Sequence, residues 1–505
     1  MGWSRREVLA ALAAAGAAPG WSALLGACGG ARPAPVVLPP ELAPAETIAG
    51  LRDQLRQVAA DLGRRFRQVA VRAELGRVTR AMVEPEERGF DQRARSSLVL
   101  AGFDGASWFE RATSDLSRDA IARAAAALSA RAAVRGAIVP RRLAPARSAT
   151  RGVGGVAKLG IDPRDRPVGD WIERAAGLQE RAAKVGGSRL VYRASAIEVD
   201  DSDVLFVGDG GRDLAQRLVR TRARVLFLAW TGARLAAEEA IAASASGLEG
   251  AELGGSEIER AAEGALTLLT SSQIEAGARE LLLDPSVAAL LVHGVARGFE
   301  GDAWARGGAR ARTLEGKAAA ADAVTLRDDP TAGGAYGGYR FDDEGWPAAP
   351  LALIERGVLR GPLCDAAAAA ALRRPRTGHG RRVGPLDPVE PRPSHLVLAA
   401  SARQRDDLLA AVDGQGFLIE SGIDGGGDPL SWRVAVRARR AREIARGRLT
   451  GRVYGPVVVA GEVPALLGAV RALDKDVQVF GWRERGAATS VATPSLLTRG
   501  WVGSG

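Results

Sequence analysis

Cysteine and histidine are scarce in this chain of 505 residues, which contains two cysteines and three histidines. A disulfide framework needs several cysteine pairs, and a structural zinc site of the finger type needs four closely spaced cysteine or histidine ligands. The sequence therefore excludes both. The length is enough for two or three ordinary domains.

Aromatic residues are also few, at 5% of the chain. The formal net charge of +10 is typical of nucleic-acid-binding proteins, but no basic run carries the interleaved aromatics that would stack on bases. The densest basic run, residues 433–448, begins as an alternating strand with Val434 and Val436 on one side. We interpret its arginines as a solvated face and expect no nucleic-acid partner.

A long apolar run is missing as well, and the alanine-rich N-terminus is broken by glycine and proline. Arg5 and Arg6 lie in a stretch that resembles a twin-arginine export signal, and residues 25–28 resemble a bacterial lipobox that ends at Cys28. We expect residues 1–28 to be a twin-arginine lipoprotein signal with Cys28 as the lipidation site. The alternative is an ordinary export signal with a chance cysteine.

The segment that follows, residues 29–46, has five prolines between residues 31 and 46 and predicts a stiff, extended tether. Together these features predict a protein held on the periplasmic side by a lipid anchor. Gly29 lacks the aspartate that marks retention in the inner membrane of some bacteria, which favours the outer membrane.

The rest of the chain predicts an α+β protein in two parts. Residues 47–273 show mixed helical and strand periodicity, and residues 274–505 are dominated by short alternating strands that predict an antiparallel, barrel-like domain. The finer predictions are helices over 47–61, 117–133, 168–185 and 256–272, a strand pair over 68–84, and a hairpin over 95–115 that turns at Asp104-Gly105.

Three glycine-rich stretches, residues 152–156, 208–211 and 422–428, lack the spacing and the lysine of a phosphate-binding loop, and we interpret them as turns. The acidic residues 342–344 also predict a turn. Cys364 is expected to be a small buried side chain.

Several segments, in their order and spacing, resemble one known family. They are LLLDPSVAALLVHGVARGFEGD (281–302), FDDEGWPAAPLALIERGVLRG (341–361), TGHGRR (377–382), PRPSHLVL (391–398) and the terminal ATPSLLTRGWVGSG. The chain resembles the TldD/PmbA, or modulator-of-DNA-gyrase, family over residues 62–505.

The resemblance implies a two-domain metallopeptidase. In catalytic members the two histidines of an HExxxH helix and a cysteine near the C-terminus bind zinc, and the glutamate is the general base. Substrates are peptides or unfolded segments held in a cavity between two subunits, and some members pair a metal-bearing subunit with one that has lost the metal.

The motif residues of this chain depart from that pattern. With Glu300 and Asp302 aligned to the family's Glu-x-Asp, the ligand positions fall on Val292 and Arg297 and the base position on His293. If one residue is deleted instead, His293 keeps a ligand position but the second histidine is still absent. Phe480 stands at the place of the cysteine ligand.

The resemblance therefore implies a degenerate site around His293, Arg297 and Glu300, and we expect no metal cofactor. Arg297 would repel a cation; it could pair with Glu300 or Asp302, or bind a substrate carboxylate. His379 and His395 match family positions that do not bind metal.

Three functions stay open. The first is a non-catalytic subunit that forms a homodimer or a heterodimer with a TldD-like, metal-bearing partner around peptide or unfolded-protein substrates. The second is an active zinc metallopeptidase rewired around His293, or an enzyme that uses His293 as the base and Arg297 to polarise a carbonyl. The third is a stand-alone peptide-binding lipoprotein.

Overall fold

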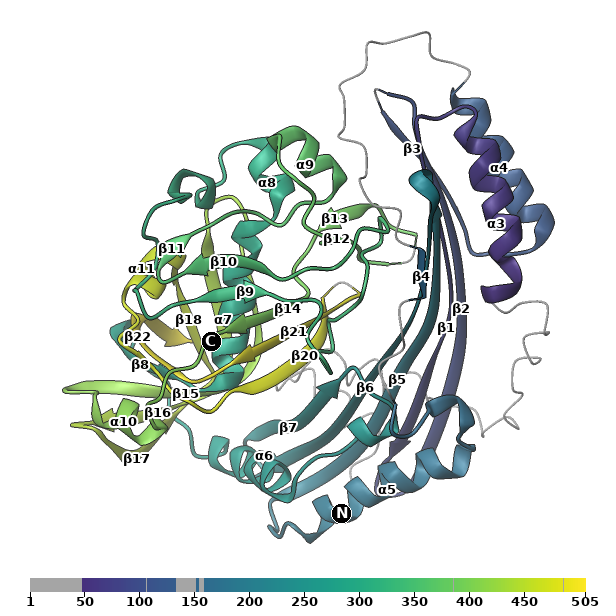
Figure 1. Ribbon diagram of the computed structural model, residues 1–505. Coiled ribbons are helices and arrows are strands. Elements are labelled where there is room, and N and C mark those ends of the chain that lie inside the picture. The colour runs from purple at the N-terminus through teal and green to yellow at the C-terminus, as the bar shows by residue number, and fades with distance from the viewer. Residues whose placement is uncertain (1–47, 106, 133–150, 154–158, 385, 485) are drawn as a thin grey trace.

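The computed structural model describes residues 48–505 except 106, 133–150, 154–158, 385 and 485. The predicted signal and the predicted tether, with Arg5, Arg6 and Cys28, lie outside the described residues. The structure confirms the α+β prediction: a helix-backed N-terminal sheet faces a C-terminal body built around a barrel (Figure 1). In the described part, no helix has both the length and the apolar character needed to cross a membrane.

The N-terminal part is a twisted sheet with the strand order β3-β2-β1-β5-β6, in which β4 and β7 both pair with β6. Its helices and strands are α3 (Ile48–Gly63), β1 (Gln68–Val83), β2 (Arg88–Phe103), β3 (Trp108–Thr113), α4 (Arg118–Ala132), β4 (Arg151–Val153), α5 (Val168–Lys184), β5 (Leu190–Gly208), β6 (Arg212–Trp230), β7 (Leu235–Ser244) and α6 (Gly255–Leu268). The four helices lie within a few residues of the predicted ranges, and Ser117 caps α4 by accepting a hydrogen bond from the Ala120 N–H.

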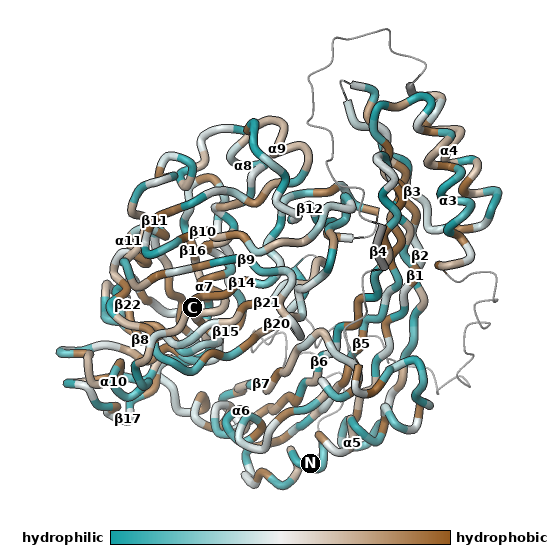
Figure 2. Tube along the Cα trace, viewed as in Figure 1, coloured by the Kyte–Doolittle hydropathy of each residue, from teal (hydrophilic) through white to brown (hydrophobic). Residues whose placement is uncertain are grey.

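Alternation along the strands gives this sheet two different faces. Odd-numbered residues such as Val199, Val225 and Phe227 are apolar and pack under the helices, while Glu198 and Arg224 point to the opposite face, toward the C-terminal part. Figure 2 shows this change between apolar and polar residues along the long strands. The N-terminal sheet therefore presents a charged wall to the rest of the protein.

The C-terminal part begins with β8 (Gly277–Leu283) and α7 (Pro285–Ala296), which continues into a short 3-10 turn (Arg297–Phe299). Five strands, β15-β8-β22-β18-β16, close into a barrel because β15 also pairs with β16. A second sheet has the order β11-β10-β9-β14-β21-β20. Nearly every residue of α7 is buried, as expected for a helix that is apolar all round and packs between the barrel and this sheet (Figure 1).

The remaining helices and strands of this part complete the two sheets and their connections. They are α8 (Gly301–Arg306), β9 (Leu326–Asp328), β10 (Leu351–Glu355), β11 (Val358–Leu359), α9 (Ala366–Leu372), β12 (Gly380–Arg382), β13 (Val389–Pro391), β14 (His395–Leu398), α10 (Arg405–Ala410), β15 (Gln415–Gly427), β16 (Arg433–Ala445), β17 (Arg448–Tyr454), β18 (Val457–Glu462), α11 (Val463–Gly468), β19 (Ala472–Leu473), β20 (Gln478–Glu484), β21 (Ala487–Thr493) and β22 (Leu496–Ser504).

One predicted strand pair is wrong. Residues 68–83 form the single strand β1, and Gly76 in its middle pairs across the sheet with Arg95 and Ser202. A Cβ atom at Gly76 would lie 2.6 Å from the Ser202 Oγ atom. The glycine therefore allows close approach of a neighbouring strand and does not make a turn.

The interpretation of residues 422–428 as a turn is also wrong, since Gly422–Gly427 belong to β15 and pair with β16 around a bulge. A Cβ atom at Gly427 would lie 2.0 Å from the Gly294 carbonyl oxygen of α7. The glycines let α7 pack directly on the barrel. The prediction of a turn at residues 208–211 is confirmed.

Candidate functional site

The C-terminal end of α7 and the 3-10 turn that follows it bring two candidate side chains to one face. His293 and Arg297 are four residues apart, so their side chains lie one helical turn apart. The helix begins at the N-cap residue Asp284, whose carboxylate accepts a hydrogen bond from the Val287 N–H 2.9 Å away, with Pro285 in the first turn. Local sequence therefore determines where the helix begins, and helical periodicity places His293 and Arg297 on the same face.

A carboxylate from β20 joins the two side chains. The Glu484 Oε2 atom lies 2.8 Å from the His293 Nε2 atom, and the Glu484 Oε1 atom lies 3.0 Å from the Arg297 Nη1 atom. Arg297 Nη1 is also 3.0 Å from Glu300 Oε1, so the structure places Arg297 against Glu300 rather than Asp302. Arg392 Nη1 lies 3.2 Å from the same Glu300 oxygen.

Burial and charge act in opposite senses on the two glutamates. Burial raises the pKa of Glu484, but the hydrogen bond from His293 and the positive charges around it outweigh burial and lower that pKa to about 2. Burial of Glu300 outweighs the attraction of Arg297 and Arg392 and raises its pKa to about 7. Glu484 is therefore the fixed negative charge of this cluster near neutral pH.

The cluster opens on a cavity of ≈ 590 Å³ between the two parts of the chain. Its C-terminal wall includes Ser286, Leu290, His293, Phe480, Trp482 and Glu484, and its N-terminal wall includes Arg80, Glu198, Arg222, Arg224, Glu239 and Ile241. The Trp482 ring stands edge-on to the imidazole of His293, with 5.2 Å between ring centroids. The cavity thus combines apolar and aromatic surface with a small number of charged groups, as ligand pockets do.

The donor set does not fit a zinc ion. Val292 is buried in the core, Phe480 packs partly buried against the same core, and neither carries a donor atom. Arg297 puts a permanent positive charge beside His293. In the part of the chain that the structure describes, no group of three or more His, Cys, Asp or Glu side chains is arranged to hold a metal ion.

The other residues singled out from the sequence lie away from this cavity. His379 is fully buried with its Nε2 atom 3.5 Å from Asp328 Oδ1, and His395 Nδ1 lies 2.9 Å from Ser490 Oγ. Cys364 is buried, as predicted, and burial raises the pKa of its thiol to about 12, which leaves it protonated and unreactive.

Sequence reasoning missed three residues of the cluster: Trp482, Glu484 and Arg392. Trp482 and Glu484 could have been found from the sequence, because they alternate with Phe480 along one face of a strand. Arg392 belongs to a loop beside β13, and no local pattern connects it with Glu300.

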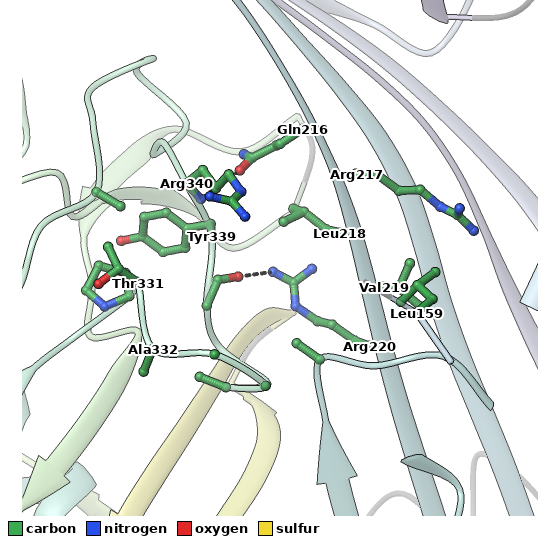
Figure 3. A pocket seen from close by; sticks show the side chains of 17 residues that line it. Leu159, Gln216, Arg217, Leu218, Val219, Arg220, Thr331, Ala332, Tyr339 and Arg340 are labelled. Carbon is green, nitrogen blue, oxygen red and sulfur yellow. Dashed lines mark hydrogen bonds between the residues drawn. The ribbon is translucent and has the colours of Figure 1, made fainter. Parts of the chain in front are cut away.

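A second cavity, of ≈ 330 Å³, lies between β6 and the loop of residues 330–340 (Figure 3). Arg220 donates hydrogen bonds there to the Tyr336 and Gly338 carbonyl oxygens, at 2.8 and 3.4 Å, and Gln216 Nε2 donates to the Phe341 carbonyl oxygen at 3.0 Å. These side chains join the two parts of the molecule by holding backbone groups of the loop.

Comparison with known proteins gives a consistent picture. Residues 276–505 match the family model of the PmbA/TldA metallopeptidase C-terminal domain. A metalloprotease of Methanocaldococcus jannaschii is 28% identical over 216 residues, 43% of this chain and 47% of the relative, and a metalloprotease TldD homolog of Haemophilus influenzae is 26% identical over 238 residues, 46% and 49% of the two chains. The match spans about half the length of these curated relatives.

Solved structures extend the likeness to most of the chain. A putative modulator of DNA gyrase from Bacteroides thetaiotaomicron has a TM-score of 0.74 at 18% identity and covers 90% of this chain and 99% of its own. TldE from Thermococcus kodakarensis has a TM-score of 0.72 at 17% identity, with coverages of 89% and 99%. At these identities the structural likeness shows a shared fold.

Proposed function

Because this chain belongs to the TldD/PmbA metallopeptidase family, we propose that it is an exported, non-catalytic subunit that holds peptides beside a metal-bearing, TldD-like partner. The observation that carries the proposal is the position of Arg297, whose guanidinium lies between Glu484 and Glu300. At 4 Å and an effective dielectric constant near 20, two unit charges interact by about 4 kcal/mol, and a divalent ion about doubles that. The positive charge of Arg297, which attracts the two glutamates, therefore opposes the binding of a zinc ion beside His293.

The strand edges beside the ≈ 590 Å³ cavity support a peptide ligand. Among the described strands, β20 pairs with β21 alone and β7 pairs with β6 alone, so each presents a sheet edge near the cavity. An extended peptide can add to such an edge through backbone hydrogen bonds, a mode that tolerates many sequences. Apolar side chains such as Leu290, Phe480 and Ile241 would then contact alternate side chains of the peptide.

Metal content tests the role of the subunit. The protein is isolated from its native host without chelators and analysed for zinc, alone and with co-purifying proteins. We expect no zinc on the isolated chain and zinc on a complex with a TldD-like subunit. Zinc on the isolated chain that is lost in His293→Ala would overturn the proposal, and the absence of both metal and partner would leave a stand-alone peptide-binding protein.

We also propose that the twin-arginine signal exports the complex and that Cys28 anchors it by lipid on the periplasmic side, at the outer membrane. A partner without its own signal would then travel folded with this subunit. In Arg5→Lys/Arg6→Lys cells both proteins should stay in the cytoplasm, and Cys28→Ala should release the subunit from the membrane fraction. Normal export of the partner in the double variant would contradict shared transport.

A second candidate function rests on the His293–Glu484 pair. The carboxylate orients the imidazole through Nε2, and the Nδ1 atom is buried without a hydrogen-bond partner among the described residues, so it could take a proton only from a group that reaches it inside the wall. Such a pair at a cavity wall can act as a general base. Cleavage of unfolded peptides by the purified chain, lost in His293→Ala and reduced in Glu484→Gln, would establish this function; absence of cleavage by pure wild type would exclude it.

A further inference from the structure

A small arginine-rich cavity, which shares the wall residue Arg483 with the cavity beside His293, lies between the N-terminal sheet and the loops around Tyr339, Val383 and Gly486. Its volume is ≈ 90 Å³. Six arginines line it: Arg72, Arg95, Arg220, Arg381, Arg382 and Arg483. Such a concentration of one charge needs compensation, because buried charges are costly unless they are paired.

Four of these arginines are compensated by carboxylates. The partners are Glu74 and Asp343 for Arg72, Glu74 and Asp200 for Arg95, Glu110 for Arg382, and Asp200 for Arg483. Even here Arg72 Nη1 is buried without a hydrogen-bond partner among the described residues. The available carboxylates are thus already shared by several guanidinium groups.

Arg220 and Arg381 have no carboxylate partner within the described ranges, although they are only 7% and 5% exposed. Arg381 donates to the Pro393 and Ala488 carbonyl oxygens at 2.7 and 2.6 Å, and Arg220 donates to the loop carbonyls described above. Backbone carbonyls satisfy donors but do not neutralise charge. Figure 3 shows the Arg220 side chain extending from β6 toward the loop that carries Tyr339.

The electrostatic state of the cavity agrees with an excess of positive charge. Burial, followed by repulsion from Arg381, lowers the pKa of Arg220 to about 10. Burial and the neighbouring Glu344 raise the pKa of the wall residue Asp342 well above its ordinary value. Its oxygens accept backbone N–H groups of Glu344, Trp346 and Gly380.

We propose that this cavity is a binding site for a small oxyanion, such as phosphate or a carboxylate, held between Arg220 and Arg381. Each guanidinium uses two nitrogens on carbonyls, which leaves Arg220 Nη1 and Arg381 Nε with no hydrogen bond to a described residue. Planar guanidinium groups match the geometry of phosphate and carboxylate oxygens.

The size of the cavity limits the ligand. A cavity needs a volume of roughly 10–15 Å³ to hold a single water molecule. The space therefore suits one small oxyanion with a few waters and is too small for a peptide segment. Arg220 comes from β6 of the N-terminal sheet and Arg381 from β12 of the C-terminal part, so a bound anion links the two parts. Binding therefore stabilises the folded chain as well as neutralising the site.

The test uses the full chain and measures thermal unfolding and calorimetric binding. Sodium phosphate or sodium acetate replaces sodium chloride at constant ionic strength. We expect phosphate to raise the midpoint of unfolding along a saturable curve. A response to phosphate alone identifies a phosphate site, and an equal response to acetate identifies a general oxyanion site that could hold a peptide carboxylate. No response to either anion overturns the proposal.

Two variants and a control localise the effect. Arg381→Met should weaken phosphate binding by about tenfold or more, because one guanidinium of the pair is lost. Ala488→Asp, opposite Arg483 in the β20–β21 pairing, adds an internal carboxylate and should abolish the response even if Arg381→Met fails to fold. Arg437→Met, at an exposed arginine paired with Asp424, should bind as wild type. Unchanged phosphate binding in Ala488→Asp would overturn the site.

Discussion

The Nε2 atom of His293 lies 2.8 Å from the Oε2 atom of Glu484, although 191 residues separate the two in the sequence. The same carboxylate contacts Arg297, so one side chain of β20 holds one side chain of α7 and one of the 3-10 turn that follows it. This relationship ties the central helix to an edge strand beside the large cavity, and it is the basis of the first prediction.

Glu484→Gln should lower the free energy of unfolding by about 1–3 kcal/mol, because Arg297 loses a charged partner and His293 loses a charge-assisted hydrogen bond. Urea denaturation followed by tryptophan fluorescence measures the loss. The matched control is Glu462→Gln, whose side chain is 57% exposed and 3.9 Å from Arg433, and it should cost less than about 1 kcal/mol. Equal losses in the two variants would show that the contacts of Glu484 with His293 and Arg297 stabilise the fold no more than an exposed ion pair does.

Arg297→His should create a zinc site. The substitution removes the positive charge and places two imidazoles one helical turn apart beside the Glu484 carboxylate, a two-histidine, one-carboxylate donor set. We expect close to one zinc per chain by elemental analysis, against less than about a tenth in wild type. Arg306→His, at a 63% exposed arginine paired with Asp302, should bind no zinc. Failure of Arg297→His to bind zinc would mean that more than one residue opposes the metal.

The stability of the wild type should fall as the pH rises from about 4 to 7, in part because of Asp365. Burial, with repulsion from Glu344, raises the pKa of this carboxyl to about 7 in the folded chain, so the folded state binds the proton more tightly than the unfolded state. Asp365→Asn keeps the cap on α9, where the side chain accepts from the Ala368 N–H at 2.7 Å, and removes the titration. The variant should gain on the order of 1–3 kcal/mol over wild type between pH 4 and pH 7.

Asp428→Asn is the control of opposite sign. A hydrogen bond from the Leu430 N–H, with another from the Ser431 hydroxyl, holds the pKa of Asp428 below its ordinary value. Its contribution to stability is present above the unfolded pKa and lost as the pH falls through the folded one. Denaturation profiles of the two variants that ran in parallel from pH 4 to pH 7 would refute the assignment to Asp365.

Gly298→Ala should destabilise the end of α7, since a Cβ atom there would lie 2.1 Å from the Trp432 Nε1 atom. Trp432 Nε1 donates to the Val295 carbonyl oxygen at 2.9 Å, so the clash breaks a buried hydrogen bond. We expect a loss of about 2–4 kcal/mol by urea denaturation. Gly177→Ala in α5, where a Cβ atom meets nothing within 4 Å, should instead stabilise by up to about 1 kcal/mol.

Local pattern was sufficient for much of the fold. Apolar spacing located α3, α5 and α6 to within a few residues, and the Asp104-Gly105 signal located the turn between β2 and β3. Local pattern failed at Gly76 and Gly427, where glycine permits close packing and does not reverse the chain. At each position an atom of a distant segment leaves no room for a Cβ atom, and the local sequence does not show that neighbour.

The sequence by itself determined that His293 and Arg297 share a helix face, since helical periodicity is local, and that Arg297 and Phe480 stand at positions where the family resemblance implies zinc ligands. Only the tertiary structure decided that Glu484 and Glu300 contact Arg297, that this cluster opens on a cavity, and that Arg220 and Arg381 line one cavity without an ion pair to a carboxylate of the described residues. The physical reason is that charge compensation and cavity shape depend on which distant strands pack together, and strand pairing in the barrel and the second sheet joins segments far apart in the sequence.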